Sequence, residues 1–154
     1  MPVPVQHFSD ILPDLAKTFD AQELAEIVIS FSDSVPRPTG KAVVWKLLLH
    51  LQSAKSVVFD DAEARSALVP ALVRWIKPHL GRYQESVLVS QSEVASTRDT
   101  ARINWVEQLR LAVTVVAVML DKLSEAIVSP SLKGRNALMA ERDNLELVFS
   151  CFPM

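Results

Sequence analysis

The sequence predicts an all-α fold in which antiparallel helices stack on one another, as in an armadillo- or HEAT-like α-solenoid. Apolar residues recur at three- and four-residue steps through most of the chain, and only three of the 154 residues are glycine. In addition, two segments open with the same acidic start signal at a spacing of forty residues. We expect one helical-repeat domain over residues 1–154.

Capping residues and prolines mark the first two helices. The first predicted helix covers the apolar positions from Phe8 to Phe19, and Pro13 is expected near its first turn, where a missing backbone N–H costs little. A second helix begins after Asp20, the expected N-cap, because Glu23 follows three residues later and completes a capping box. Two prolines and a glycine in SVPRPTG, residues 34–40, disfavour the α conformation and end this helix.

The middle of the chain predicts two more helices. Residues 41–53, KAVVWKLLLHLQS, are apolar around most of the helix circumference and are therefore expected in the centre of the fold. The next helix, residues 59–80, repeats the Phe-Asp-x-x-Glu start of the second one, with Asp60 as the expected N-cap. Two interpretations of this spacing stay open: a helix-pair repeat near the period of about 40–47 residues found in HEAT and armadillo proteins, or two ordinary acidic caps.

The last third of the chain predicts a loop and two helices. The Ser- and Thr-rich segment at about 90–100 is expected to be a flexible polar loop. The longest helix runs roughly from Thr100 to Val128. Its apolar run, Leu111–Leu120, is shorter than the roughly 20 residues that span a membrane, which indicates a buried core helix. A final helix, about Asn136 to Phe152, stops without a polar tail, so we expect the chain to be a fragment of a longer one.

Composition argues against several classes of function. A net charge of −2 provides no general attraction for nucleic acid or for an anionic membrane. The single cysteine, Cys151, excludes an intrachain disulfide and suits a reducing, cytoplasmic compartment. His7, His50 and His79 are too scattered to predict a zinc site, and no motif for an activated nucleophile is present. We expect no catalytic residue, no metal and no cofactor.

The first candidate for partner binding is the basic and aromatic stretch LVRWIKPHLGRY, residues 72–83. On a helical wheel, Arg74 and Lys77 fall opposite the apolar side, and Pro78 kinks or ends the helix. The interpretation we favour is a helix end whose basic residues complement the negative end of the dipole. The alternative is a patch that binds an anion or a protein partner.

The second candidate is the end of the final helix. If the chain is one piece of a solenoid, Phe149 and Phe152 should leave an apolar patch where the next repeat belongs. We expect this patch to bind the rest of a longer parent chain, another protein or a second copy of the chain.

Residues 45–83, WKLLLHLQSAKSVVFDDAEARSALVPALVRWIKPHLGRY, resemble the helical middle region of the Dock (dedicator of cytokinesis) family, and residues 8–36 are similar in style. That family consists of large exchange factors for Rho-family GTPases, with armadillo-like helices between a lipid-binding C2-like domain and the catalytic region. The resemblance implies a connecting scaffold. Nothing in the chain resembles the catalytic region, so no exchange residue can be assigned.

The predicted function is therefore a non-catalytic scaffold segment that makes protein contacts within or between chains, with no nucleic acid bound and no direct insertion into a membrane. The alternative is a free-standing α-helical interaction module of unrelated descent, and a small helical enzyme comes third. Residues outside the chain would distinguish the first two, because a lipid-binding domain upstream would favour the Dock interpretation.

Overall fold

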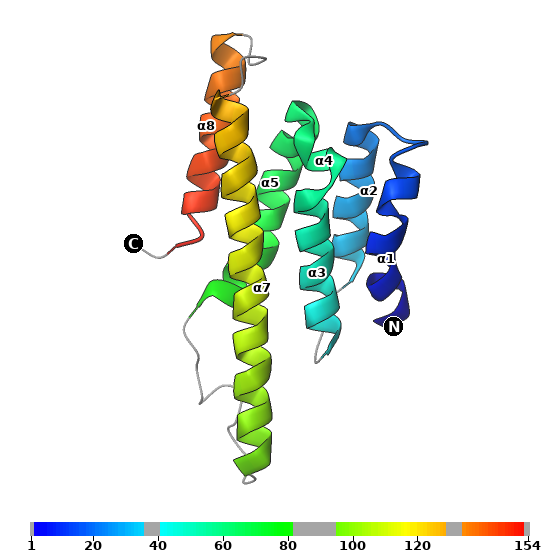
Figure 1. Ribbon diagram of the computed structural model, residues 1–154, viewed down its shortest axis with the longest axis vertical. Helices are drawn as coiled ribbons and strands as arrows, with labels where there is room; N and C mark the ends of the chain where they lie inside the picture. The colour runs from blue at the N-terminus through cyan, green and yellow to red at the C-terminus, as the bar shows by residue number, and fades with distance from the viewer. Residues whose placement is uncertain (1, 36–40, 82–94, 129–133, 153–154) are drawn as a thin grey trace.

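The computed structural model describes residues 2–35, 41–81, 95–128 and 134–152, and every regular element in these ranges is a helix (Figure 1). The elements are α1 (Pro2–Leu15), α2 (Ala21–Ser34), α3 (Lys41–Lys55), the one-turn α4 (Val57–Asp60), α5 (Ala62–Ile76), the 3₁₀ helix η1 (Lys77–Leu80), α7 (Ala95–Val128) and α8 (Arg135–Phe149). The all-α prediction is confirmed.

The long helices form two layers. In one layer α1 packs against α3 and α3 against α7; in the other, α2 packs against α5 and α5 against α8. Successive long helices run in opposite directions, and α1 and α8 lie at opposite edges of the molecule (Figure 1). Each helix therefore packs against its counterpart in the next helix pair, which is how a solenoid is built. The predicted antiparallel stack is confirmed, with α1/α2, α3/α5 and α7/α8 as its pairs.

The start of α2 confirms the predicted capping box. The Asp20 carboxylate accepts a hydrogen bond from the backbone N–H of Glu23 at 2.8 Å, and the Glu23 carboxylate accepts one from the backbone N–H of Asp20 at 3.2 Å. Each side chain thus satisfies a donor that the first turn leaves unpaired.

The predicted cap of the fourth helix was wrong by one residue. The N-cap of α5 is Asp61, which accepts from the backbone N–H of Ala64 at 2.9 Å. Asp60 instead ends α4 and accepts a hydrogen bond from Lys122 of α7 at 2.7 Å. The difference arises because residues 57–60 form a helical turn of their own. Since α2 and α5 occupy consecutive places in one layer, the forty-residue spacing nevertheless corresponds to consecutive helix pairs.

Prolines and a glycine set other helix limits. Pro13 lies in the last turn of α1 rather than near the first, because α1 already begins at Pro2. The prediction that Pro78 ends or kinks its helix is confirmed, since α5 stops at Ile76 and continues as η1. Gly134, which precedes α8, has a φ of 102°, a conformation that side chains with a Cβ disfavour.

The longest helix begins earlier than predicted. α7 starts at Ala95 instead of near Thr100, so the second half of the predicted polar loop is helical. Serine and threonine have only moderately lower helix propensity than alanine, so a segment rich in them can still be helical. The remainder of that predicted loop lies outside the described residues.

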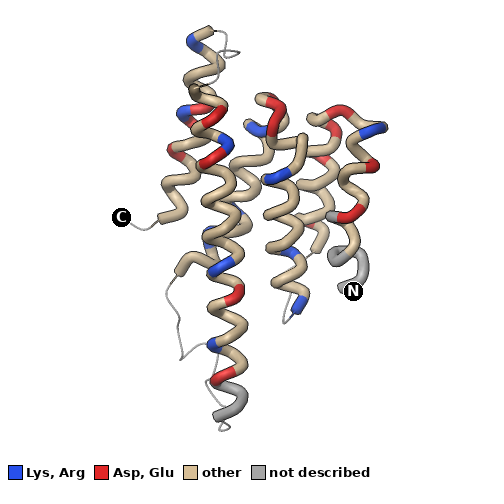
Figure 2. The backbone as a smooth tube through the Cα atoms, in the orientation of Figure 1, with Lys and Arg blue, Asp and Glu red and all other residues tan. Residues whose placement is uncertain are grey.

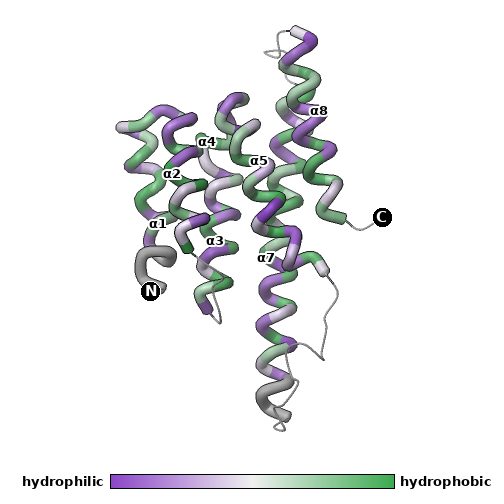
Figure 3. Tube along the Cα trace, turned by 180° about the vertical axis from the view of Figure 1, so that it is seen from behind, coloured by the Kyte–Doolittle hydropathy of each residue, from purple (hydrophilic) through white to green (hydrophobic). Residues whose placement is uncertain are grey.

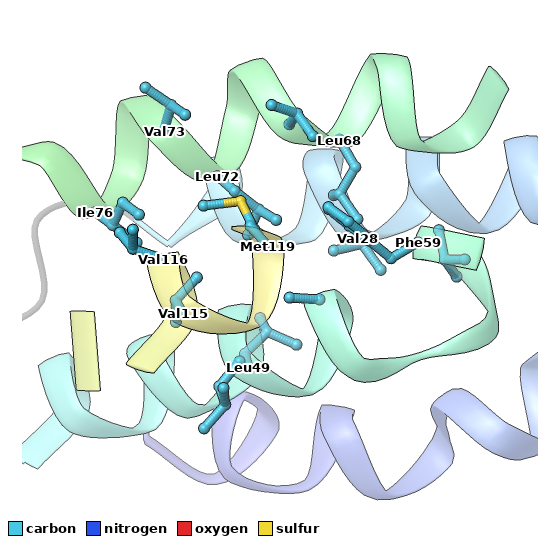
Figure 4. Packing of buried hydrophobic residues seen from close by; sticks show 14 of the residues in the cluster. Val28, Leu49, Phe59, Leu68, Leu72, Val73, Ile76, Val115, Val116 and Met119 are labelled. Atoms are coloured by element: carbon cyan, nitrogen blue, oxygen red, sulfur yellow. The ribbon is translucent and has the colours of Figure 1, made fainter. Parts of the chain in front are cut away.

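The core lies where the two layers meet (Figure 4). Side chains from α2, α3, α4, α5 and α7 converge there, with Met119 and Val116 of α7 close to Leu72 and Ile76 of α5. The predicted core helix therefore contributes one buried face. Its opposite face is open, however: Val113 is 47% exposed and Ile103 is 66% exposed. No described helix combines the length and apolar character needed to cross a membrane.

Candidate interaction sites

A pocket of about 430 Å³ opens between α3 and the α5–η1 junction. We call it the His50 pocket, and its lining consists of Val43, Lys46, Leu47, His50, Trp75, Pro78 and His79. Most of this lining is apolar or aromatic, with one ammonium group and two imidazoles. This composition is typical of ligand sites, which are mostly apolar with a few oriented polar groups.

His50 is the most constrained side chain of the pocket. Its ring is buried and stacks on Trp75, with ring centroids 4.6 Å apart and an interplanar angle of 15°. Its Nε2 lies 2.9 Å from the Ser32 hydroxyl of α2, whereas its Nδ1 has no hydrogen-bond partner among the described residues. Burial lowers the pKa of His50 to about 3, and the charge on Lys46 contributes in the same direction. The imidazole is therefore neutral at physiological pH.

Hydrogen bonds join the C-terminal end of α2 to residues of this pocket. The Asp33 carboxylate accepts hydrogen bonds from Trp75 Nε1 at 2.8 Å and from Arg74 Nη2 at 2.9 and 3.1 Å. The hydrogen bond from Trp75 is the main cause of the lowered pKa of Asp33, and Arg74 adds to it. Lys46 Nζ donates to the Val35 carbonyl at 3.0 Å. These contacts hold the Trp75 ring in place beside His50.

The two basic residues predicted as partner contacts, Arg74 and Lys77, point to different sides of the end of α5. Arg74 turns to α2 and pairs with Asp33, with side chains 61% and 47% exposed. Lys77 is exposed and lies near enough to Cys151 for its charge to act on that thiol, although burial has the larger effect and raises the pKa of Cys151. The two cations do not converge on one group. Both remain candidates for partner contacts, but not as a single patch.

The two predicted phenylalanines are at the outer edge of the stack. Phe149 is 54% exposed and Phe152 is 42% exposed, at the C-terminal end of α8. Three other large apolar side chains of α8 are also exposed, namely Leu138, Met139 and Leu147. Figure 3 shows α8 at the edge of the molecule, with hydrophobic residues at its C-terminal end. We call these five residues the α8 face.

A buried ion pair, absent from the sequence-based predictions, joins α5 to α8. Arg65 and Glu141 have side chains 7% and 3% exposed, and Arg65 Nε donates to both carboxylate oxygens at 3.1 and 3.0 Å. A sequence signal did exist. Arg65 precedes Leu68 by three residues and Leu72 by seven, so it lies on the apolar stripe of α5.

Figure 2 shows acidic and basic residues interspersed along α7 and α8, whereas acidic residues predominate where α1, α2 and α5 meet the upper edge of the view. In the described part of the chain, no three His, Cys, Asp or Glu side chains come close enough to hold a metal ion together.

Similarity to known proteins identifies the family. A family model described as the dedicator of cytokinesis (DOCK) TPR region matches residues 2–139. No curated protein and no solved structure gave a match. TPR repeats are helix–turn–helix units, which agrees with the stacked helix pairs of this structure. Because the match covers most of the chain, the protein belongs to the DOCK TPR-region family.

Proposed function

We propose that the chain is a non-catalytic helical scaffold segment of a Dock-type exchange factor for Rho-family GTPases, and that it makes contacts within its parent protein or with other proteins. The family match over residues 2–139 is the observation that carries this proposal. It also argues against the alternative of an interaction module of unrelated descent. In this proposal the segment needs no cofactor, binds no nucleic acid and acts in the cytoplasm.

The α8 face is the proposed contact surface with the rest of the parent chain. α8 packs on α5 and α7 along one side only, where Glu141, Asn144 and Val148 are buried. Its other side carries the five exposed apolar residues. In a solenoid each helix pair covers the apolar side of its neighbour, so a following helix is the natural occupant. When that neighbour is absent, the same face favours self-association.

Replacing both phenylalanines tests this surface. The variant Phe149→Ser/Phe152→Ser should keep the fold and remain monomeric at concentrations where the unmodified chain associates, because both rings are largely exposed. Sedimentation velocity over a concentration series and thermal unfolding followed by circular dichroism provide the two readouts. Phe19→Ser, at an exposed ring that precedes α2, is the matched control and should leave association unchanged. Unfolding of the double variant would show that the rings belong to the core.

The non-catalytic assignment has its own test. Added alone to a Rho-family GTPase loaded with fluorescent nucleotide, the chain should leave the rate of nucleotide release unchanged. Acceleration by the isolated chain would contradict the assignment, whatever the outcome for the α8 face.

A further inference from the structure

The N-terminal part of α7 extends beyond the other helices of the stack, at the lower end of the view in Figure 1. α7 has 34 residues, whereas the other long helices have 14 or 15. α8 packs beside the opposite, C-terminal part of α7 (Figure 1). A further helix pair of ordinary length, stacked on α7 and α8, would therefore leave the protruding part uncovered. This surface is distinct from the α8 face.

Four exposed residues lie along one side of this part of α7, namely Asp99, Ile103, Val106 and Arg110. They follow one another at steps of four, three and four residues, which is the spacing of the contact positions in a coiled coil. Ile103 is 66% exposed and Val106 is 49% exposed, and neither charged residue forms an ion pair within the described part of the chain. We call these four residues the α7 stripe. Its two apolar side chains are thus uncovered between a negative and a positive charge.

The order of residues in the α7 stripe is complementary to itself when a second copy runs antiparallel. With a two-fold axis between residues 104 and 105, Asp99 faces Arg110 of the second copy at both ends, and Ile103 faces Val106 of the second copy in the centre. Parallel pairing would instead place like charges opposite each other. A shift of one heptad in either direction would place a charge against an apolar side chain. Polar residues at contact positions specify register in this way, so the charges select one arrangement.

We propose that the α7 stripe pairs with the α7 stripe of a second copy of this chain, as an antiparallel two-helix interface. The two helical stacks then lie at opposite ends of the paired helices, because only the protruding parts overlap. The interface covers two apolar side chains of each chain, against five on the α8 face. This dimer is therefore weak and reversible, and it forms at higher concentrations than association through the α8 face. The inference does not depend on the parent protein being an exchange factor.

Charge reversal tests the proposal, in chains that also carry Phe149→Ser and Phe152→Ser so that the α8 face does not contribute. Sedimentation equilibrium at up to about 1 mM measures the dimer. Asp99→Arg and Arg110→Asp should each weaken it at least about tenfold, because like charges then face each other at both ends. An equimolar mixture of these two variants should associate as strongly as the chain with the original stripe, since opposite charges face each other again.

Asp121→Arg is the matched control, because it makes the same change of charge at an exposed residue of α7 outside the overlap and should leave the dimer unchanged. Circular dichroism of each variant establishes that the fold is intact. The same variants in the chain with both phenylalanines provide the comparison if the double serine background is unstable. Absence of a dimer at about 1 mM, a dimer insensitive to Asp99→Arg, or a mixture that stays monomeric would each overturn the proposal. None of these results bears on the α8 face, which lacks these charges.

Discussion

The two ends of α5 hold their neighbours with the same chemistry in opposite environments. Near the first turn, Arg65 pairs with Glu141 of α8, and in the last turn Arg74 pairs with Asp33 of α2. The first pair has side chains 7% and 3% exposed, and the second has side chains 61% and 47% exposed. Burial, and not the identity of the charged groups, decides how much each pair matters to the fold.

The buried pair is embedded in a set of hydrogen bonds that engages all three guanidinium nitrogens. Besides Glu141, Arg65 donates through Nη1 to the carbonyls of Phe59 at 2.8 Å and Asp60 at 3.2 Å. Its guanidinium carbon lies 6.0 Å from the centroid of the Phe59 ring. Arg65 therefore provides a donor to the last two carbonyls of α4, and through Glu141 it also holds α8 against α5. A buried charge needs such a set, because each unpaired donor would carry a desolvation cost.

The exposed pair depends less on its protein hydrogen bonds. One nitrogen of Arg74 donates to both Asp33 oxygens, and water can solvate either charge if the contact breaks. Trp75 Nε1 is a second donor to the same carboxylate, so Asp33 keeps a partner without Arg74. Exposed pairs of this kind contribute at most about 1 kcal/mol.

The largest expected effect comes from breaking the buried pair. Glu141→Ala leaves the Arg65 charge buried without its carboxylate and should lower the free energy of unfolding by about 3–5 kcal/mol. Urea denaturation followed by circular dichroism measures this loss. The double variant Arg65→Met/Glu141→Leu removes both charges and should recover most of it. A loss below about 1 kcal/mol in Glu141→Ala would mean that the two ends of α5 are equivalent.

An intermediate effect on the free energy of unfolding is expected from lowering the pH, through His50, which stacks on Trp75 in the last turn of α5. Because the pKa of His50 is about 3 in the folded state and 6.5 is its ordinary value, the unfolded chain binds a proton below about pH 6.5 that the folded chain does not. Stability should therefore fall as the pH falls, by up to about 1.4 kcal/mol per pH unit. The lowered pKa of His79 acts in the same direction.

The variant His50→Gln isolates this contribution, since glutamine is neutral and can still meet the Ser32 hydroxyl. Urea denaturation between pH of about 7 and about 4.5 should show a shallower pH dependence for His50→Gln than for the unmodified chain. Stopping there keeps the protonation of Asp33, whose pKa is lowered from 3.8, outside the range. Identical slopes for the two proteins would contradict the assignment to His50.

The smallest effect is expected at the exposed pair. Asp33→Asn keeps an acceptor for Trp75 and loses only the charge, so the free energy of unfolding should change by less than about 1 kcal/mol. The same urea experiment, repeated at low and high salt, provides the measurement. A loss comparable to that of Glu141→Ala would show that the contact stabilises the fold despite its exposure.

Rules for helix capping and for proline predicted the helix ends that depend only on residues within one turn. Glu23 caps the α2 start together with Asp20 because both lie within one turn, and Pro78 ends α5 because its own ring removes a donor. The same rules misplaced the cap of α5. Asp60 and Asp61 are adjacent acidic residues, and the turn formed by α4 decides which of them faces the unpaired N–H groups.

The candidate sites were predicted only in part. Phe149 and Phe152 were identified from their apolar character at a helix end, and Arg74 and Lys77 from their position opposite the apolar stripe. Asp33, the partner of Arg74, was missed because it lies 41 residues away, and nothing in its own helix marks it. The His50 pocket was missed for the same reason, since its walls come from three elements, α3, α5 and η1.

The sequence by itself determined the helices, the approximate period of their pairs and the family. Hydrophobic spacing and capping depend on residues a few positions apart, so both can be recognised directly in the sequence. The tertiary structure alone decided which charges are buried. Arg65 and Glu141 are 76 residues apart, and nothing near either of them in the sequence indicates that the two will meet. Their contribution depends on the exclusion of water by helices from both layers, and no local pattern specifies that exclusion.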